Sequence, residues 1–288
     1  MPGNLAMAFV ATLVAGLAVS WFAGSIMVQG HNTNVAPARH PSEDIALFTS
    51  DGIRIAATFA PGRNDTSPAV LLLHGVDASR DALATNAAWL HSLGYATLAI
   101  DFRGHGQSSL ASRTFGFTEA RDARAAFEWL KRRQNDAPVA VIGISLGGAA
   151  ALIGEGGPLP ADALILQAVY PDIRLAIRNR IASRLTTAPA YLLEPFLSFQ
   201  APLRFGVWPD RLSPLDAVGG YRGPVLVIGG ELDRSTPPAE SRALFAAVNG
   251  HRELWLTPQG DHAEICQLSD TAYRARIRSF LERTMRLP

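Results

Sequence analysis

The sequence predicts an α/β fold in which a mostly parallel central sheet is flanked by helices. Short apolar runs, typical of buried strands, alternate with amphipathic helical segments between residues 69 and 168. The 288 residues are 48% hydrophobic, which is enough for one large core. A β-branched run also leads into a Gly-x-Ser-x-Gly segment at 143–147, and an alanine-rich stretch follows it. That order is typical of a strand, a tight turn and a helix.

The first expected element is an apolar helix. No charged residue occurs from Ala6 to Val28, and a helix of that length, about 35 Å, crosses a hydrocarbon core of roughly 30 Å. We expect an uncleaved signal-anchor or transmembrane helix over 1–30 and a polar linker over 31–43. Cleavage near Ala36, which would release a secreted or periplasmic protein, is the alternative. The single Arg39 favours a cytoplasmic catalytic domain too weakly to decide the membrane face.

Three small residues of this helix, Gly16, Ser20 and Gly24, lie four apart and therefore share one face. Such a stripe can let two membrane helices approach closely. The alternative, which we favour, is that an apolar segment simply tolerates small residues.

The α/β domain is expected over 44–288 and opens with a hairpin, because the Asp51-Gly52 pair is typical of tight turns. Strands then alternate with the crossover helices that parallel pairing needs. The predicted strands are Ala69–Leu73, Tyr95–Ile100, Val139–Ile142, Ala163–Ala168, Pro224–Gly230 and His251–Leu256. The predicted helices are Arg80–Leu93, Glu119–Gln134 and Ser145–Gly154.

The alternation breaks between Tyr170 and Tyr221, where about fifty residues separate two core strands. We interpret 171–220 as a small, mainly helical cap that supplies an apolar pocket and excludes water. A packing insertion that never touches substrate is the alternative. Four arginines lie along one face of its first helix and form either a solvated face or an anion-attracting one: Arg174, Arg178, Arg180 and Arg184.

Ser145 stands at the centre of the Gly-x-Ser-x-Gly turn, and a serine hydroxyl needs a base held by a third group to act as a nucleophile. Asp233 follows one predicted strand, and His262 follows the next in a loop. We therefore expect Ser145 as nucleophile, His262 as general base and acid, and Asp233 as the orienting carboxylate. An ordinary helix cap at Ser145 and an exposed loop histidine at 262 are the plainer alternatives. Glu231, Asp172 and Asp261 compete for the acid position, although Asp261 is better explained as a turn residue.

The strand 69–73 ends in His74-Gly75, which allows the backbone to turn inward. We expect the backbone N–H groups of Val76 and Leu146 to form an oxyanion hole, where such donors stabilise the charge of a tetrahedral intermediate. His74 is expected to hold the loop rather than to take part in catalysis.

These segments resemble the α/β-hydrolase superfamily, in its serine-aminopeptidase-like and lysophospholipase-like esterase group. The matching segments are Leu73-His74-Gly75, Asp101–Ser108, Gly143–Gly148, Gly230–Asp233 and Gly260–His262. The resemblance implies an α/β-hydrolase fold from about Asp44 to the C-terminus. It also implies that the Asp101–Ser108 loop is structural, so Asp101, Arg103 and His105 are not expected to be catalytic. The fold hosts many chemistries, so the resemblance does not identify the substrate.

Composition limits the classes of binding partner and cofactor that we expect. A net charge of +1 provides no field to recruit nucleic acid, and a single cysteine, Cys266, allows no intramolecular disulfide. No ligand cluster has metal spacing and no loop cradles phosphate, so we expect neither metal nor cofactor. Lys131 is the only lysine, which indicates a bacterial source with a high-GC genome. Oligomeric state stays open.

The sequence therefore predicts a membrane-tethered serine hydrolase of the carboxylesterase or lipase type that cleaves an ester or related acyl bond of a small molecule. An aminopeptidase or a thioesterase of the same fold is the alternative. A peptidase would need acidic cap residues to hold an amino terminus, and Glu194 and Asp210 are the candidates. A non-catalytic binding scaffold is a third hypothesis, less favoured because all three triad positions are filled.

Overall fold

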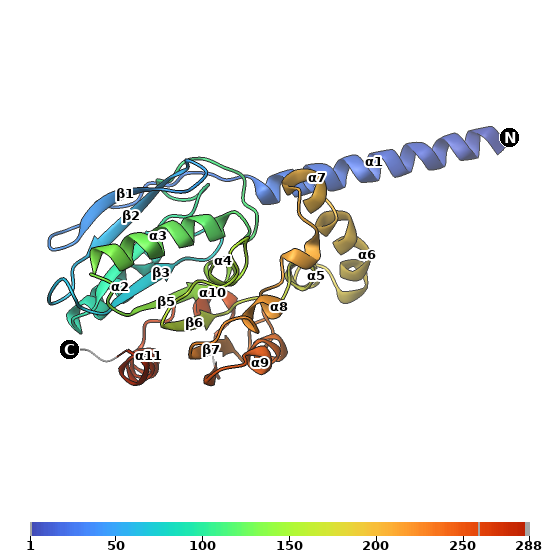
Figure 1. The fold of residues 1–288 in the computed structure, drawn as a ribbon. Helices are drawn as coiled ribbons and strands as arrows, with labels where there is room; N and C mark the ends of the chain where they lie inside the picture. Colours follow the sequence, from blue (N-terminus) through green and yellow to red (C-terminus); the bar gives the residue numbers. More distant parts are fainter. Residues whose placement is uncertain (1, 259, 286–288) are drawn as a thin grey trace.

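A computed structural model describes residues 2–258 and 260–285, and its centre is a sheet of eight strands in the order β1-β2-β4-β3-β5-β6-β7-β8 (Figure 1). β1 and β2 form an antiparallel hairpin, β2 pairs antiparallel with β4, and the remaining pairs are parallel. The strands are β1 (Glu43–Phe48), β2 (Arg54–Ala60), β3 (Ala69–Leu73), β4 (Ala96–Ile100), β5 (Val139–Ile144), β6 (Ala163–Gln167), β7 (Val225–Gly230) and β8 (Arg252–Thr257). The predicted mostly parallel α/β fold is confirmed.

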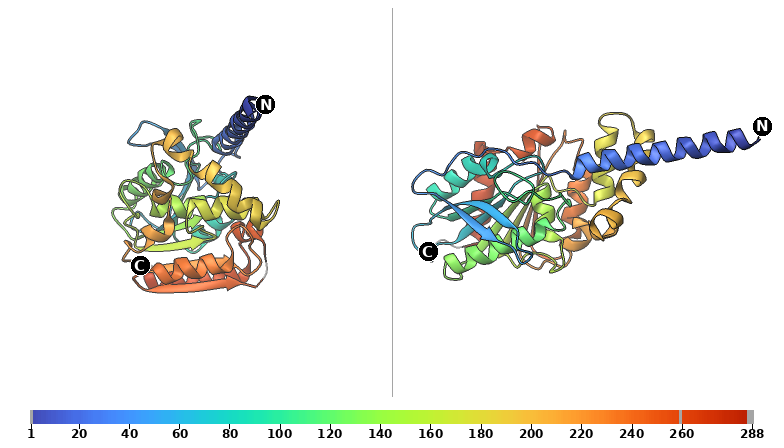
Figure 2. Two further views of the ribbon diagram at one scale, coloured as in Figure 1. Left: turned by 90° about the vertical axis from the view of Figure 1, so that its right-hand side faces the viewer. Right: turned by 90° about the horizontal axis from the view of Figure 1, so that it is seen from above.

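Helices cover both faces of this sheet (Figure 2). One face packs against α2 (Ala84–Ser92) and α11 (Thr271–Thr284), and alternate strand residues such as Val70 and Leu72 point to it. The other packs against α3 (Glu119–Arg133), α4 (Leu146–Leu152), α8 (Pro214–Val218) and α9 (Pro238–Ala247), with Leu71 and Leu73 on that side. Burial on both faces explains why the parallel strands are continuous apolar runs in the sequence.

Parallel pairing brings the carboxyl ends of β3, β5, β6 and β7 to one edge of the sheet. In register, Leu73 lies beside Gly143 and Gln167 lies beside Ile228. The segments that follow these strands therefore converge at this edge. They carry His74 to Val76, Ser145, Tyr170 and Asp233.

The cap contains α5 (Ile173–Ala182), α6 (Thr187–Ser198) and α7 (Ala201–Phe205). The predicted insertion over 171–220 also includes α8, but α8 packs against α4 and α9 of the main body. The part that stands above the sheet edge is therefore shorter than the insertion. Beside it lies α1 (Pro2–Val28), a long helix that packs on α6 at its carboxyl end and projects away from the body at the other (Figures 1 and 2).

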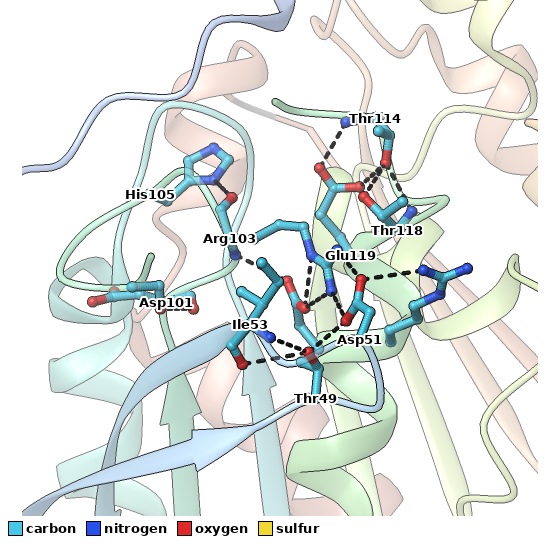
Figure 3. A network of polar contacts seen from close by, with 12 residues as sticks. Thr49, Asp51, Ile53, Asp101, Arg103, His105, Thr114, Thr118 and Glu119 are labelled. Carbon is cyan, nitrogen blue, oxygen red and sulfur yellow. Dashed lines mark hydrogen bonds and ion pairs between the residues drawn. The ribbon is translucent and has the colours of Figure 1, made fainter. Parts of the chain in front are cut away.

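The Asp101–Ser108 loop makes many buried polar contacts with neighbouring segments (Figure 3). Arg103 donates from both Nη atoms to Asp51 at 2.7 and 3.0 Å, and from its backbone N–H and Nε to Asp122, each at 2.9 Å. Asp101 accepts hydrogen bonds from the N–H groups of Arg80 (2.7 Å) and Gln107 (2.8 Å). These contacts tie the hairpin turn, α3 and the loop together, which agrees with the structural role that the resemblance implied.

Several details differ from the sequence predictions. Residues 31–33, at the start of the expected linker, contact the main body, since the N–H groups of His31 and Thr33 donate to the carbonyls of Gly104 and Gly106 at 3.1 and 2.9 Å. His262 does not lie in a loop but begins α10 (His262–Cys266). The helices α9 and α11 were not predicted, and residues 80–83 form a 3₁₀ turn before α2.

Candidate active site

Ser145 occupies a strained turn between β5 and α4. Its backbone angles, φ 48° and ψ −108°, lie in a region that residues with a side chain rarely adopt. A Cβ added to Gly143 would lie 2.6 Å from the backbone nitrogen of Gly148, and one added to Gly147 would lie 2.2 Å from the carbonyl oxygen of Leu73. The turn that projects the serine therefore requires both glycines, as the sequence pattern predicts.

Asp233 follows β7 and holds His262. The Nδ1 of His262 lies 2.8 Å from Oδ2 of Asp233, while Oδ1 accepts hydrogen bonds from the N–H groups of Ser235 and Thr236, each at 2.8 Å. The aspartate side chain is fully buried, whereas the imidazole is partly exposed. With Nδ1 as the donor to Asp233, Nε2 of a neutral His262 is left as an acceptor.

The other carboxylates that compete with Asp233 have different roles. Asp172 caps the start of α5 by accepting from the N–H of Leu175 at 2.9 Å, and Glu231 pairs with Arg242 at the surface at 3.3 Å. Asp261 caps α10 in a reciprocal arrangement with the Glu264 side chain, so it is a helix cap rather than a simple turn residue. Of these four, Asp233 is the one whose carboxylate hydrogen-bonds to the imidazole of His262.

Gln167, the last residue of β6, links the serine turn to the histidine helix. Its carbonyl accepts from the N–H of Ser145 at 2.8 Å, and its side-chain amide donates to the carbonyl of Ile265 on α10. Among the described residues the Ser145 hydroxyl has no hydrogen-bond partner. Contacts of this kind often tighten only when substrate is bound.

Two backbone N–H groups are available beside Ser145. Leu146 begins α4, and the N–H groups in the first turn of a helix have no partner within the helix. Val76 lies on the loop after β3, where a Cβ added to Gly75 would be 3.7 Å from the Ser145 Cβ. Within 2–258 and 260–285, neither N–H donates a hydrogen bond, and both residues line the cavity that contains Ser145.

His74 holds this loop in place. Its Nε2 accepts from the N–H of Phe102 at 3.1 Å, so its Nδ1 carries the proton and donates to the carbonyl of Gly75 at 2.7 Å. Burial, together with the neighbouring His105, lowers the pKa of His74 to about 3. The ring is therefore neutral near pH 7 and has both nitrogens engaged, as expected for a structural residue.

The electrostatic surroundings of His262 are different. Burial lowers its pKa, but the hydrogen bond with Asp233 and the nearby Cys266 outweigh burial and raise the pKa of His262 to about 9. Asp233 and Cys266 therefore stabilise the imidazolium form of this ring. An imidazole that gains a proton readily is suited to receive one from a neighbouring hydroxyl.

Ser145 opens into a cavity of about 1390 Å³ that reaches from the sheet edge to the cap and α1. Its lining is mainly apolar and includes Tyr170 from the body, Ile177 and Leu197 from the cap and Leu17 from α1. This lining agrees with the prediction that the insertion covers the serine. An apolar cavity that leads to a few polar groups is typical of a site for a mostly apolar small molecule.

The cap arginines separate into two pairs. Arg174 and Arg178 donate to the buried carboxylate of Glu194, at 2.8 and 3.2 Å, and Ser198 donates to the same group at 2.6 Å. Arg180 and Arg184 instead line the cavity. Arg180 and Arg184 therefore face the cleft, as one of the two alternatives had it. Arg174 and Arg178 are instead held by the buried carboxylate of Glu194.

Sequence reasoning missed three residues at this site. Gln167 had a signal, since it is a polar residue that ends an otherwise apolar strand. Arg113 and Asp77 form an ion pair beside the cavity, and Arg113 also contacts His31 at 3.1 Å. They come from distant segments, so no local pattern predicts that they meet. Among the described residues, no group of three or more side chains is arranged to bind a metal ion.

Known proteins similar to this chain agree with the fold. A family model described as serine aminopeptidase, S33, matches residues 64–199. The uncharacterized protein Rv2307c of Mycobacterium tuberculosis is 30% identical over 255 residues, which cover 88% of this chain and 82% of that protein. The esterase PF2001 of Pyrococcus furiosus superposes with a TM-score of 0.70 at 21% identity, covering 89% of this chain and 98% of that one. A lysophosphatidylserine lipase, ABHD12 of Gallus gallus, is 34% identical over 127 residues, 42% of this chain and 33% of the lipase.

Proposed function

The chain belongs to the α/β-hydrolases, in the group that the S33 serine aminopeptidase model describes, and from this premise we propose that it is a serine hydrolase that cleaves carboxylic esters. The observation that carries the proposal is the 2.8 Å hydrogen bond between His262 and a buried Asp233, on the same sheet edge as the strained Ser145 turn. A nucleophile, a base and an orienting acid are the groups that the Ser-His-Asp mechanism of acyl transfer uses.

In the proposed mechanism the Ser145 hydroxyl attacks the ester carbonyl carbon while Nε2 of His262 takes its proton. Asp233 keeps Nδ1 protonated and stabilises the imidazolium that forms. The N–H groups of Val76 and Leu146 bind the oxyanion of the tetrahedral intermediate. His262 then gives its proton to the leaving alcohol, and a water molecule, deprotonated by His262, releases the acid and restores Ser145.

An ester fits this site better than a peptide with a free amino terminus. Of the two acidic cap candidates, Glu194 is buried and neutralised by Arg174 and Arg178, and Asp210 is exposed outside the cavity lining. The charged side chains of the cap that line the cavity are cationic, Arg180 and Arg184. They would repel a substrate ammonium group. The esterase and lipase names of PF2001 and ABHD12 support the same choice.

Fluorophosphonate labelling with peptide mapping tests this function, beside p-nitrophenyl esters from acetate to palmitate and amino-acid p-nitroanilides. We expect the label on Ser145, ester turnover, and loss of both in Ser145→Ala with little change in melting temperature. Label without ester turnover, together with anilide cleavage, would favour the aminopeptidase. A folded protein that takes no label would favour the non-catalytic scaffold.

We also propose that α1 anchors the enzyme in a membrane. Within the described residues, Met7–Val28 is long and apolar enough to cross a bilayer, and its large apolar side chains are mostly exposed. A 27-residue helix is about 40 Å long. The test is the fraction of the full chain that stays with membranes after an alkaline wash, with intact-mass analysis of its amino terminus. A soluble product cut near Ala36 would instead show a cleaved signal.

A further inference from the structure

The cavity at Ser145 has a wall that the proposed hydrolytic machinery does not use. Residues along α1, among them Leu13, Gly16, Leu17, Ala23 and Met27, line it opposite the cap. The lining begins at Phe9 and ends on α1 near Met27, 18 residues later, so the lined stretch of helix is about 27 Å long. Met27 packs on the main core, whereas the helix leaves the body toward its amino end (Figure 2). The cavity is therefore a groove that follows α1 away from the serine.

Specific polar contacts fix α1 against the cap. The Ser20 hydroxyl donates to the carbonyl of Phe196 at 2.8 Å, and the Gln200 amide donates to the Ser20 carbonyl at 3.0 Å. Arg204 donates to the Trp21 carbonyl at 2.6 Å, and its guanidinium lies 3.9 Å from the Trp21 ring centroid. These bonds satisfy backbone carbonyls and hydroxyls where an apolar helix meets a globular domain. The contact is therefore specific in register and is not simple apolar adhesion.

Residues of the small-residue stripe take part in this contact. A Cβ added to Gly24 would lie 2.1 Å from Oε1 of Gln200, the mobile end of the side chain that precedes α7, so a larger residue here would displace that amide. Ser20 makes the hydrogen bonds just described, and a Cβ on Gly16 would meet nothing within 4 Å. Two members of the stripe thus seat the cap, and the third leaves space in the groove.

Exposed apolar side chains line the groove on both of its sides. On the cap, Leu185, Leu193 and Phe196 line it and are exposed by 59%, 41% and 46%. On α1, Phe9 lines the groove and is itself 71% exposed. Large apolar patches that border a binding groove are typical of surfaces that meet a membrane or an apolar ligand. Residues 2–19, which precede the cap contact, form about 27 Å of helix, close to the thickness of a hydrocarbon core.

We propose that α1 is one wall of the substrate site as well as an anchor, and that the acyl chain of a long-chain lipid ester passes from the bilayer along α1 to Ser145. The inference rests on the proposed esterase function and adds the substrate class to it. The ester carbonyl sits at Ser145, the first methylenes lie near Met27 and Ala23, and the chain end lies near Gly16. Position along α1 therefore determines how long an acyl chain the site accepts.

The test uses the full chain in detergent-free lipid nanodiscs and compares three tryptophan variants. Gly16→Trp places a ring in the outer groove and Ala23→Trp in the inner groove. The matched control, Ala18→Trp, lies about 160° around the helix from Gly16 and is exposed outside the groove lining. Turnover of p-nitrophenyl acetate, octanoate and palmitate is measured for each variant, with fluorophosphonate labelling as a measure of an intact Ser145.

We expect Gly16→Trp to lower the palmitate-to-acetate ratio of kcat/KM about tenfold or more, since each excluded methylene costs a large factor. Ala23→Trp should lower the octanoate-to-acetate ratio as well, and Ala18→Trp should keep the wild-type ratios. Unchanged ratios in both groove variants, an equal effect of Ala18→Trp, or a mature chain cut after α1 would overturn the proposal. Failure of the wild type to take the label or to cleave any ester would instead reject the esterase function itself.

Discussion

The cavity at Ser145 has two walls that are built in different ways. The inner wall, at the carboxyl edge of the sheet, carries Val76, Ser145 and Leu146 on its lining. Buried polar side chains with fixed partners, such as Asp233 and Gln167, lie behind it. The outer wall, formed by α1, α5 and α6, consists mainly of apolar side chains held by a few polar contacts. The inner wall tolerates little change in single residues, because each makes a contact that no other supplies. The outer wall depends on shape, so changes there should alter substrate range before they alter chemistry.

The largest effect should come from the inner wall. Asp233→Asn keeps the shape of the side chain but removes its charge, which favours the wrong tautomer of His262, and we expect kcat to fall about 10⁴-fold. Asp172→Asn is the control, since Asp172 caps α5 and does not contact His262. Steady-state rates on a short ester measure both. Full activity of Asp233→Asn beside a dead Asp172→Asn would assign the acid to Asp172.

The glycines of the serine turn provide the next comparison. Gly147→Ala forces a methyl group to 2.2 Å from the backbone oxygen of Leu73, so we expect it to destabilise the fold by about 1–3 kcal/mol or more and to displace Ser145. Gly219→Ala, whose new methyl group would have its nearest neighbour at 3.5 Å, is the control and should stay within about 0.5 kcal/mol. Denaturant midpoints and fluorophosphonate labelling rates measure the two effects. A normal labelling rate in Gly147→Ala would show that the turn is not as tightly constrained as its geometry indicates.

The pH dependence of the rate tests how strongly Asp233 and Cys266 stabilise the protonated form of His262. In the proposed mechanism only neutral His262 takes the serine proton, and Asp233 and Cys266 raise its pKa to about 9 against the opposing effect of burial. We therefore expect kcat/KM to rise with pH through about 9 and to fall roughly tenfold per pH unit below it. In Cys266→Ala this limb should move to lower pH, because one of the groups that stabilise the imidazolium is gone. If the pH profile of Cys266→Ala does not move, Asp233 alone would account for the raised pKa of His262.

The same contrast explains what could be predicted from the sequence. Parallel strands are buried on both faces, so their apolar runs locate them within one or two residues, as at β3 and β6. The serine turn could be predicted because its backbone geometry requires glycine at positions 143 and 147. The helix that begins at His262 was missed although Asp261 and Glu264 have the spacing of a capping box. The outer wall could be predicted only as an apolar insertion, because the contact between α1 and α7 joins residues about 180 apart in the chain.

The smallest effect on turnover that we expect concerns Glu194, the carboxylate that holds α5 and α6 together in the outer wall. Burial would raise the pKa of Glu194, but hydrogen bonds from Arg174, Ser198 and Arg178 outweigh burial and lower it. The stabilisation is therefore complete above pH 4.5, the ordinary value for a glutamate, and is lost only in more acidic solution.

Glu194→Gln keeps the hydrogen bond from Ser198 and removes the charge that two arginines share. Because Arg174 is partly exposed and can be hydrated, we expect a local loss of about 1–3 kcal/mol, seen as faster hydrogen exchange over α5 and α6. Glu282→Gln, in an exposed pair with Arg278, should change nothing measurable.

Since Glu194 does not line the cavity, turnover of acetate esters should persist in Glu194→Gln while KM for long-chain esters rises. An equal loss on both substrates would mean that the two walls are coupled and that the cap also positions the catalytic groups.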